Sequence, residues 1–597
     1  MTALVTQHFR IHQAIQFFES FDEDQSTRYY YYIGKNYAST NATPTQGTVK
    51  LTNSSNTVVG SGTLFDTELA PGNIVRVSGT SQDLRVHAIT SAQTFISAIR
   101  PSSTITVGAN LYIRSLYDDY NPSQPNSSYQ NIYFDIWRNM IAAKRIQTSD
   151  FTHAALRYNW IYDTVYTEYD DLDPDLHLKQ YYVVTSVGNV YKCIDNNNGG
   201  SSTVEPAGIS NEIILMDDNY RWKYMFTLSS GRKLKFLTGD YIPVQTLTID
   251  DSSDQWDVQS SAANGAINHI KILASGSNYL SVSNTFANVS SKSAFNLDPS
   301  SSVVDGTYTG SSLFISSGPG LGEVRKIVKY FGSNNYCEVN SEFSSLPTTM
   351  STYIVSPTVT IRGDSNYGSK ATAYVSNTFS GQVRKITIID QGSSYSTANV
   401  TITANTSHGY GATARPIISP IGGHGSDPVD ELNATNIIMN IRVSGAESNS
   451  FPTNNDFRLI GIVRDPLLAN GSPATVSTLD QTTRVNVNEV SGDFVGDEVV
   501  VGLSSGAKGR LVYFAPTDEA RTQGNLKLVR ITTNGEGETF QVGEIVEGLT
   551  STRTANVQSV TPGAMKKYSG IVIYTENRTP VIRALEQTED VKIIINF

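Results

Sequence analysis

Residues 571–597 read IVIYTENRTPVIRALEQTEDVKIIINF, with an apolar run at each end. The two runs, 571–574 and 591–597, are short and rich in β-branched residues, which predicts two strands. Between them, Glu576-Asn577-Arg578 followed by Pro580 predicts a turn. Because an exposed apolar end would pair with other chains, we expect the second strand to complete the sheet of a folded core.

The composition is that of a β-rich protein with several domains. A chain of 597 residues is too long for one core and should divide into roughly three to five domains. Only 17% of the residues are charged, and Tyr (32) far outnumbers Trp (4), which is typical of β-rich structural and recognition surfaces. The net charge of −11 argues against a nucleic-acid partner, since phosphate contacts need a basic surface.

The cysteines and the apolar runs indicate a protein made in a reducing compartment. Cys193 and Cys337 are far apart and neither has a CxxC partner, so no disulfide framework or zinc ribbon is expected. No apolar run approaches about 18 residues, so we expect no membrane partner. The first six residues lack the basic and apolar regions of a signal peptide.

Two helices are predicted, at about 7–21 and about 131–145. Thr6 is the candidate N-cap of the first. The second has apolar residues near helical spacing from Tyr133 to Ile141. Nearly all other segments have the composition of strands and turns.

The run Tyr29-Tyr30-Tyr31-Tyr32 is a candidate interface stripe. On a strand, Tyr30 and Tyr32 would share one face and Tyr29 and Tyr31 the other. One face would then pack on the core while the other contacts a partner, although core packing alone explains the run equally well. We take Tyr30 and Tyr32 as candidate interface residues.

An internal repeat links two distant segments. Residues 265–279 and 381–395 share a Gly, aliphatic residues at +2, +5 and +7, a second Gly at +11 and a Tyr at +14. A second element repeats at 359–373 and 400–414, so the first copy is split by a nested β module at about 291–357. Alternating apolar residues with fixed Gly turns predict strands stacked into a small sandwich or solenoid-like unit.

A different repeat lies near the end of the chain, where 494–505 matches 540–551. This repeat marks 481–561 as another inserted β module with internal duplication. A third inserted module is predicted at 46–113 from its low charge and from hairpin signals such as Pro71-Gly72-Asn73. We therefore predict a mainly β, minor α+β, multi-domain fold: a discontinuous β-sandwich core with a few helices and inserted small β modules. The predicted core is 1–45, 114–260, 426–480 and 562–597, and the insertions are 46–113, 261–425 (with the nested module 291–357) and 481–561.

The predicted core carries a family resemblance. The last segment has the pattern Ile-Tyr-x-Glu-Asn-Arg-x-Pro, an aliphatic residue, Gln587-Thr588-Glu589 and an apolar finish on Phe597. It resembles the C-terminus of the dimeric baseplate wedge subunit of T-even-like contractile-tailed phages. Other blocks resemble the same family in the same order: the first helix with Phe9-Arg10 and Phe17-Phe18, Val190-Tyr191-Lys192-Cys193 with Thr203-Val204-Glu205-Pro206, 220–226, and 456–461 with Asp465-Pro466-Leu467. These blocks cover roughly half of the chain; Asp465 stands where Asn is usual, and both residues suit a turn.

The resemblance implies a function in assembly. It predicts a structural subunit of the virion tail baseplate, assembled in the host cytoplasm, that forms a homodimer within each wedge. This dimer would bridge other wedge proteins and rearrange on host attachment; tail-fibre proteins are a further candidate partner. Glu576 and Arg578 are candidate interface residues, with a local ion pair as the alternative. The alternative function is a receptor-binding or fibre-attachment adhesin whose modules bind host glycans, for which a trimer would be expected.

No catalytic, cofactor-binding or metal-binding residue is predicted, and we do not expect an enzyme. The acidic run from Asp170 to Asp175 lacks the Gly and the distal Glu of a calcium loop, so a solvated turn is preferred. His8 and His12 have metal-capable spacing but no third ligand in view. The glycine runs 318–322 and 502–506 are not P-loops. A carboxylate pair for glycoside cleavage stays open, since such pairs meet only in the fold.

Overall fold

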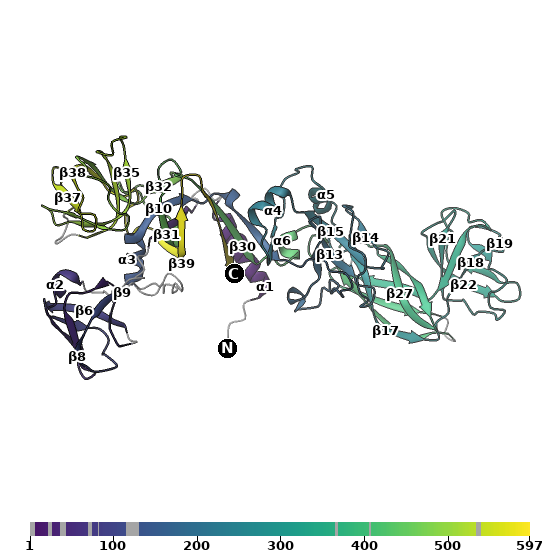
Figure 1. Ribbon diagram of the computed structural model, residues 1–597. Coiled ribbons are helices and arrows are strands. Elements are labelled where there is room, and N and C mark those ends of the chain that lie inside the picture. Colours follow the sequence, from purple (N-terminus) through teal and green to yellow (C-terminus); the bar gives the residue numbers. More distant parts are fainter. Residues whose placement is uncertain are drawn as a thin grey trace. The chain divides into compact units, whose positions relative to one another are not determined.

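A computed structural model describes residues 6–21, 27–35, 43–69, 74–80, 83–114, 130–364, 368–404, 408–532 and 539–597. These residues form forty strands, six α-helices and two 3-10 helices, arranged in several sheets (Figure 1). The prediction of a multi-domain, mainly β fold is confirmed. The hairpin signal at 71–73 and all of residues 115–129 lie outside the described residues.

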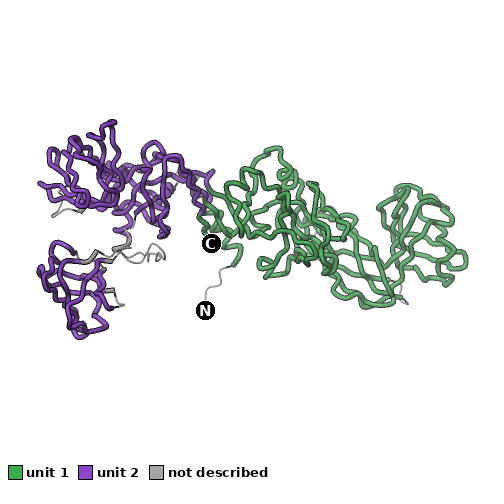
Figure 2. Tube along the Cα trace, in the orientation of Figure 1, with its two compact units in different colours: residues 1–16, 151–439, 593–597 green, residues 17–150, 440–592 purple. Residues whose placement is uncertain are grey.

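The chain divides into two compact units, each made of separate segments (Figure 2). Unit 1 contains 1–16, 151–439 and 593–597, and unit 2 contains 17–150 and 440–592. Segments far apart in sequence therefore belong to the same unit. The boundaries predicted for the core and for the inserted modules stay predictions.

Unit 2 is built on a five-stranded antiparallel sheet whose last strand is β39. The order is β32 (Thr478–Asp480), β10 (Met140–Arg145), β1 (Tyr29–Gly34), β31 (Asn455–Arg464) and β39 (Ile571–Arg583). The helix α3 (Gln130–Asn139) supplies Ile136 and Trp137 to the core on one face of this sheet. After β31, Asp465 turns the chain with a φ of 49°, in agreement with the predicted turn.

Unit 2 also holds an eight-stranded sheet and a closed six-stranded barrel. The sheet has the order β2 (Thr43–Pro44), β9 (Leu111–Arg114), β5 (Ile74–Val77), β6 (Asp83–Ser91), β7 (Thr94–Ser97), β4 (Thr57–Ser61), β3 (Thr48–Leu51) and β8 (Ile105–Ala109), with the short helix α2 (Phe65–Glu68). The barrel has the order β33 (Thr483–Asn488), β36 (Gly524–Thr532), β35 (Lys508–Pro516), β34 (Val499–Gly502), β37 (Ile545–Gly548) and β38 (Thr554–Thr561). The 3-10 helix η1 (Thr148–Asp150) follows β10.

Unit 1 contains a compact body made of two four-stranded sheets and short helices. One sheet has the order β16 (Tyr241–Val244), β11 (Phe151–Leu156), β30 (Asn436–Ser444) and β40 (Thr588–Asn596), of which 440–444 and 588–592 are counted in unit 2. The other has the order β12 (Tyr182–Val184), β13 (Asn189–Asp195), β15 (Arg221–Thr227) and β14 (Ile213–Leu215). The helices of the body are η2 (Leu176–Leu178), α4 (Ser230–Phe236), α5 (Asp254–Ser260), α6 (Pro428–Glu431) and α1 (Gln7–Glu19), whose residues 17–19 are counted in unit 2.

The remainder of unit 1 is the long insertion that leaves the body with β17 and returns with β29. Three strand pairs form its nearer part: β17 (Ile267–Ser277) with β29 (Tyr410–Ile418), β25 (Thr358–Gly363) with β28 (Ala398–Thr403), and β26 (Thr372–Phe379) with β27 (Gln382–Asp390). We call this part the interleaved module. A seven-stranded sheet is nested in it: β18 (Val282–Thr285), β24 (Thr352–Ser356), β21 (Ser312–Ser317), β22 (Val324–Phe331), β23 (Tyr336–Val339), β20 (Ala294–Asn296) and β19 (Asn288–Val289).

The two copies of the first repeat exchange their contacts in the interleaved module. The backbone N–H of Tyr279 donates to the carbonyl of Gly381 (2.9 Å), and that of Tyr395 donates to Gly265 (3.1 Å). The Tyr279 hydroxyl accepts a hydrogen bond from Ala412 N (3.2 Å), while the Tyr395 hydroxyl accepts one from Ala371 N (3.0 Å). Each copy therefore supplies hydrogen-bond partners to the other.

The two copies of the repeat in the barrel also exchange hydrogen bonds, in this case through two buried glutamates. Glu498 accepts hydrogen bonds from the backbone N–H (2.9 Å) and hydroxyl (2.9 Å) of Ser551 in the second copy. Glu544 accepts the matching bonds from Ser505 in the first copy, both 2.9 Å. A side chain added at Gly502 would come within 2.6 Å of the Glu544 carboxylate, so the close approach requires glycine there.

Both predicted helices exist, but the second is shorter than expected. The helix α1 begins after Thr6, whose hydroxyl accepts from Phe9 N at 3.4 Å. The predicted helix 131–145 is wrong beyond Asn139, because Met140–Arg145 forms β10 between β1 and β32. Pairing with two strands thus overrides the helical spacing of the apolar residues.

Candidate functional site

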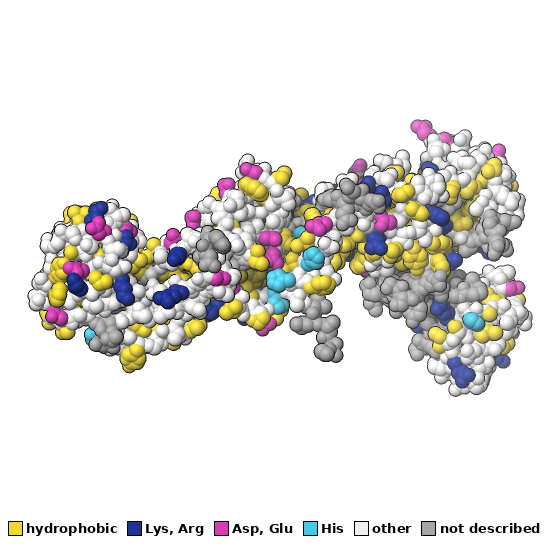
Figure 3. All heavy atoms as spheres, turned by 180° about the vertical axis from the view of Figure 1, so that it is seen from behind, with side chains coloured by type: hydrophobic (Ala, Val, Ile, Leu, Met, Phe, Trp, Pro, Cys, Tyr) yellow, Lys and Arg dark blue, Asp and Glu magenta, His cyan; other side chains and the backbone are white. Residues whose placement is uncertain are grey.

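The strand β39 is the edge strand of its sheet and presents apolar side chains to solvent. Among the described strands it pairs only with β31. Its exposed aliphatic residues, together with one in the following loop, are Ile571, Ile573, Ile582 and Leu585. We call β39 with Leu585 the C-terminal edge. Figure 3 shows hydrophobic side chains gathered in a broad group on one face of unit 2, interspersed with Lys and Arg.

An exposed apolar edge of this kind can add a strand from another chain. Its outer row of backbone N–H and C=O groups is a template for pairing. Pairing would be interrupted near Pro580, which has no N–H to donate. The register with β31 also shifts there, since Leu459 faces Asn577 while Phe457 faces Val581. The edge can therefore bind a strand most regularly along Ile571–Asn577.

The structure places the two predicted charged interface residues on this edge. Glu576 is half-buried and accepts a hydrogen bond from the Tyr574 hydroxyl at 2.6 Å, while Arg578 is exposed. The predicted turn at 576–578 is wrong, because these residues lie inside the thirteen-residue strand β39. The side chains of Tyr574, Glu576 and Arg578 are thus displayed along a strand.

The two predicted tyrosines are core residues, which corrects the expectation of an exposed stripe. Tyr30 and Tyr32 are fully buried, as are Tyr29 and Tyr31. The strand β1 lies between β10 and β31, so it is an inner strand, and both of its faces are covered. The Tyr30 hydroxyl donates to the carbonyl of Val476 (2.7 Å) inside unit 2.

Arg583 anchors the end of the C-terminal edge and was not singled out from the sequence. It is 1% exposed, and its Nε donates to both carboxylate oxygens of Glu589 at 3.1 Å. Its Nη1 donates to Pro452 O (3.1 Å) and its Nη2 to Gly445 O (2.5 Å). This buried arginine ties the end of β39 to the beginning of β40. The only signal in the sequence is an Arg six residues before a Glu, which is too common to be informative.

The body of unit 1 has a buried ionic cluster at its centre. Lys192 on β13 forms a salt bridge with Glu431 of α6, and both side chains are almost completely buried. The other Glu431 oxygen accepts from Gly425 N (2.7 Å) and Asp427 N (3.2 Å). The Lys192 ammonium also lies 4.5 Å from the centre of the Tyr169 ring. The cluster holds α6 and the loop before it against β13.

Burial and charge shift the pKa values of this cluster. Burial alone would raise the pKa of Glu431, but Lys192 and His424 lower it to about 2. Burial and then Lys192 lower the pKa of His424 to about 3, so its imidazole is neutral. Burial lowers the pKa of Lys192, although Glu431 opposes the change. This set of groups forms an ion pair built into the core.

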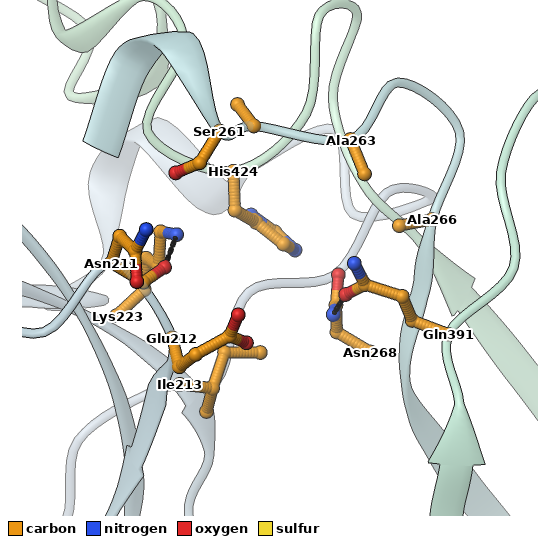
Figure 4. A pocket seen from close by; sticks show the side chains of 11 residues that line it. Asn211, Glu212, Ile213, Lys223, Ser261, Ala263, Ala266, Asn268, Gln391 and His424 are labelled. Carbon is orange, nitrogen blue, oxygen red and sulfur yellow. Dashed lines mark hydrogen bonds between the residues drawn. The ribbon is translucent and has the colours of Figure 1, made fainter. Parts of the chain in front are cut away.

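A small polar pocket lies beside this cluster, and His424 points into it (Figure 4). It encloses about 350 Å³ including its open mouth. Its one hydroxyl side chain, Ser261, donates to the carbonyl of Asp257 (2.6 Å). Asn268 donates to Gln391 at 2.5 Å across it. The pocket can hold water or a small polar molecule.

The acidic run beginning at Asp170 attaches the interleaved module to the body. The preferred reading as a solvated turn is corrected for Asp170 and Asp171, because Arg415 on β29 donates to Asp170 (2.5 Å) and Asp171 (2.8 Å). Burial would raise the pKa of Asp170, but a backbone hydrogen bond from Leu172 and Arg415 lower it. Further along, Asp173 pairs with Lys179. His8 and His12, for which no metal role is predicted, are exposed on α1, where His8 lies 3.5 Å from Asp430.

Comparison with known proteins gives no assignment: no protein-family model and no curated protein matches this chain. Within the described residues, no helix combines the length and the apolar character needed to cross a bilayer.

Proposed function

We propose that this protein is a structural subunit of the baseplate wedge of a contractile-tailed phage, and that it works by binding rather than by chemistry. The resemblance of its C-terminal segment and of the blocks at 190–226 and 456–467 to the T-even wedge subunit supports the proposal. The subunit would form a homodimer in each wedge, bridge neighbouring wedge proteins and take part in rearrangement on host attachment.

The observation that carries this proposal is the C-terminal edge. The segment with the most specific resemblance to the family forms the outermost strand of the unit 2 sheet, with exposed isoleucines and an exposed Arg578. A subunit that works by assembly needs such a surface, since apolar area and unpaired backbone groups together drive strand addition. Arg583 anchors the end of this edge through buried hydrogen bonds, and an edge that is ordered before binding lowers the entropy that binding must overcome.

Light scattering coupled to size-exclusion chromatography tests the proposal. The expected mass is twice the 65.1 kDa of one chain. Replacing Ile573→Lys should shift the mass toward that of a monomer, because it places a charge on the edge. Ile421→Lys is the matched control, since Ile421 is 94% exposed in unit 1, and it should leave the mass unchanged. A trimer would favour the adhesin instead, and a dimer insensitive to Ile573→Lys would remove the C-terminal edge from the account.

A further inference from the structure

Three side chains from separate segments meet where the interleaved module joins the body. His269 lies on β17, Asp195 ends β13, and Glu168 lies in the long loop after β11. One possible ligand atom from each lies within 4.8 Å of the other two. The side chains of Glu168, His269 and Asp195 are 9%, 12% and 13% exposed, so the group is largely shielded from water.

Each carboxylate uses one oxygen in a hydrogen bond or ion pair and aims the other at the imidazole. Glu168 Oε1 lies 2.9 Å from Lys271 Nζ, and its Oε2 lies 3.6 Å from His269 Nε2. Asp195 Oδ1 accepts from Asn197 N at 2.9 Å, and its Oδ2 lies 3.5 Å from His269 Nδ1. Both imidazole separations are longer than a hydrogen bond. The separation of His269 Nδ1 from Asp195 Oδ2 matches that of two ligands of one ion, which are about 3.4 Å apart when each lies about 2.0–2.2 Å from a tetrahedral centre.

We propose that Asp195, His269 and Glu168 form a binding site for a divalent transition-metal ion of the Zn²⁺ class. His269 Nδ1 and Asp195 Oδ2 are the direct ligands, because Asp195 is the carboxylate with no salt bridge to Lys or Arg among the described residues. Glu168 Oε2 faces the remaining N–H of the ring at 3.6 Å; a shorter separation on metal binding would let it accept this N–H and fix the ring, as carboxylates commonly do behind a metal-bound histidine. Water completes the coordination.

Two carboxylates and two cationic side chains surround the ring. The groups that face His269 are Glu168, Asp195, Arg221 and Lys271. Burial, more than any of these charges, lowers the pKa of His269 and keeps its imidazole neutral, the form that binds metal. Lys271 neutralises the charge of Glu168, with which it forms a salt bridge. Of the two carboxylates, Asp195 is therefore the one left to bind the ion.

Such an ion would fasten the interleaved module to the body. His269 belongs to the module, whereas Asp195 and Glu168 belong to the body. The junction already contains ion pairs from Lys271 and Arg415 to the loop at 168–171. A metal would add a bond at the root of the arm that carries the nested seven-stranded sheet. This inference is independent of the proposed baseplate function and can fail without it.

Titration calorimetry with ZnCl₂ and visible absorption with Co²⁺ test the site in the full-length chain. The exposed pair His8 and His12 is replaced by Ala in every sample, so that it cannot contribute. The expected result is one ion per chain with the d–d bands of nitrogen and oxygen ligands. His269→Gln and Asp195→Asn should abolish saturable binding. Glu168→Gln should weaken it roughly 10- to 100-fold, as is usual for an orienting carboxylate.

The matched control is His87→Ala, since His87 is an exposed histidine in unit 2. It should leave the binding isotherm unchanged. Far-UV circular dichroism of each variant checks that the chain folds, and Asp195→Asn serves if His269→Gln does not fold. The inference is overturned if the parent shows no saturable binding, or if folded His269→Gln and Asp195→Asn variants bind as the parent does.

Discussion

The buried pair of Lys192 and Glu431 gives the sharpest stability prediction. Glu431→Gln keeps the size of the side chain and one acceptor oxygen, but it removes the negative charge. Lys192 is then left in the core with no counter-charge, since its side chain is fully buried. The backbone N–H groups of Gly425 and Asp427 also lose a charged acceptor.

The general cost of breaking a buried ion pair sets the magnitude. Removing one partner of such a pair costs about 3–5 kcal/mol. The lowered pKa of Glu431 agrees in sign, because Lys192 and His424 favour the charged form of its carboxyl. We therefore expect the free energy of unfolding of unit 1 to fall by about 3 kcal/mol in Glu431→Gln at neutral pH.

Urea unfolding followed by tryptophan fluorescence measures this loss, because three of the four tryptophans, Trp160, Trp222 and Trp256, lie in unit 1. Adding Lys192→Met to Glu431→Gln should recover part of the loss, since it removes the unpaired charge. Glu342→Gln, at an exposed glutamate, is the control. A Glu431→Gln variant within about 0.5 kcal/mol of the parent would refute the reasoning.

Three further predictions follow from buried polar groups. Folding lowers the pKa of His424 from 6.5 to about 3, so as the pH falls the unfolded chain binds a proton at His424 before the folded chain does. The free energy of unfolding should therefore fall as the pH falls from 6.5 toward 3. Urea titrations should show a less steep fall in His424→Gln. Tyr279→Phe and Tyr395→Phe should each cost about 1–3 kcal/mol by urea unfolding, and to a similar extent, because each leaves one backbone N–H of the other copy without its acceptor. Glu498→Gln and Glu544→Gln should each lower the melting temperature of the barrel by calorimetry, at a cost of about 1–3 kcal/mol.

Matched variants decide these three outcomes. Tyr410→Phe removes an exposed hydroxyl from the same module and should be silent, as should Glu519→Gln in the barrel. Strongly unequal losses for the two tyrosines would contradict the exchange of contacts between the copies. A stability profile that stays flat between pH 6.5 and 3 would contradict the neutral, buried His424.

The sequence predicted the fold class because strand signals are local. Alternating apolar residues and fixed glycines identified the segments that became β17 and β27. They could not show that the two copies exchange contacts, since equivalent segments of a repeat are interchangeable until the chain folds. For the same reason, the repeated Glu498 and Glu544 could be matched in sequence, but their partners in the opposite copy could not.

The errors came from features that only neighbouring segments determine. Ile141 continues a helical spacing, yet its backbone lies in β10 between two partner strands. Alternation assigns Tyr30 and Tyr32 to one face but cannot tell whether that face is covered. Arg583 gave no signal, because its partners Gly445, Pro452 and Glu589 contact it only in the folded chain.

The most direct test of the central proposal is an electron cryo-microscopy map of the assembled tail that contains this chain, in which the six-stranded barrel and the interleaved module identify the subunit. The account predicts two adjacent copies in each baseplate wedge, with their C-terminal edges buried between subunits. Copies found as trimers in a fibre, or wedge copies whose β39 edges face solvent, would contradict it.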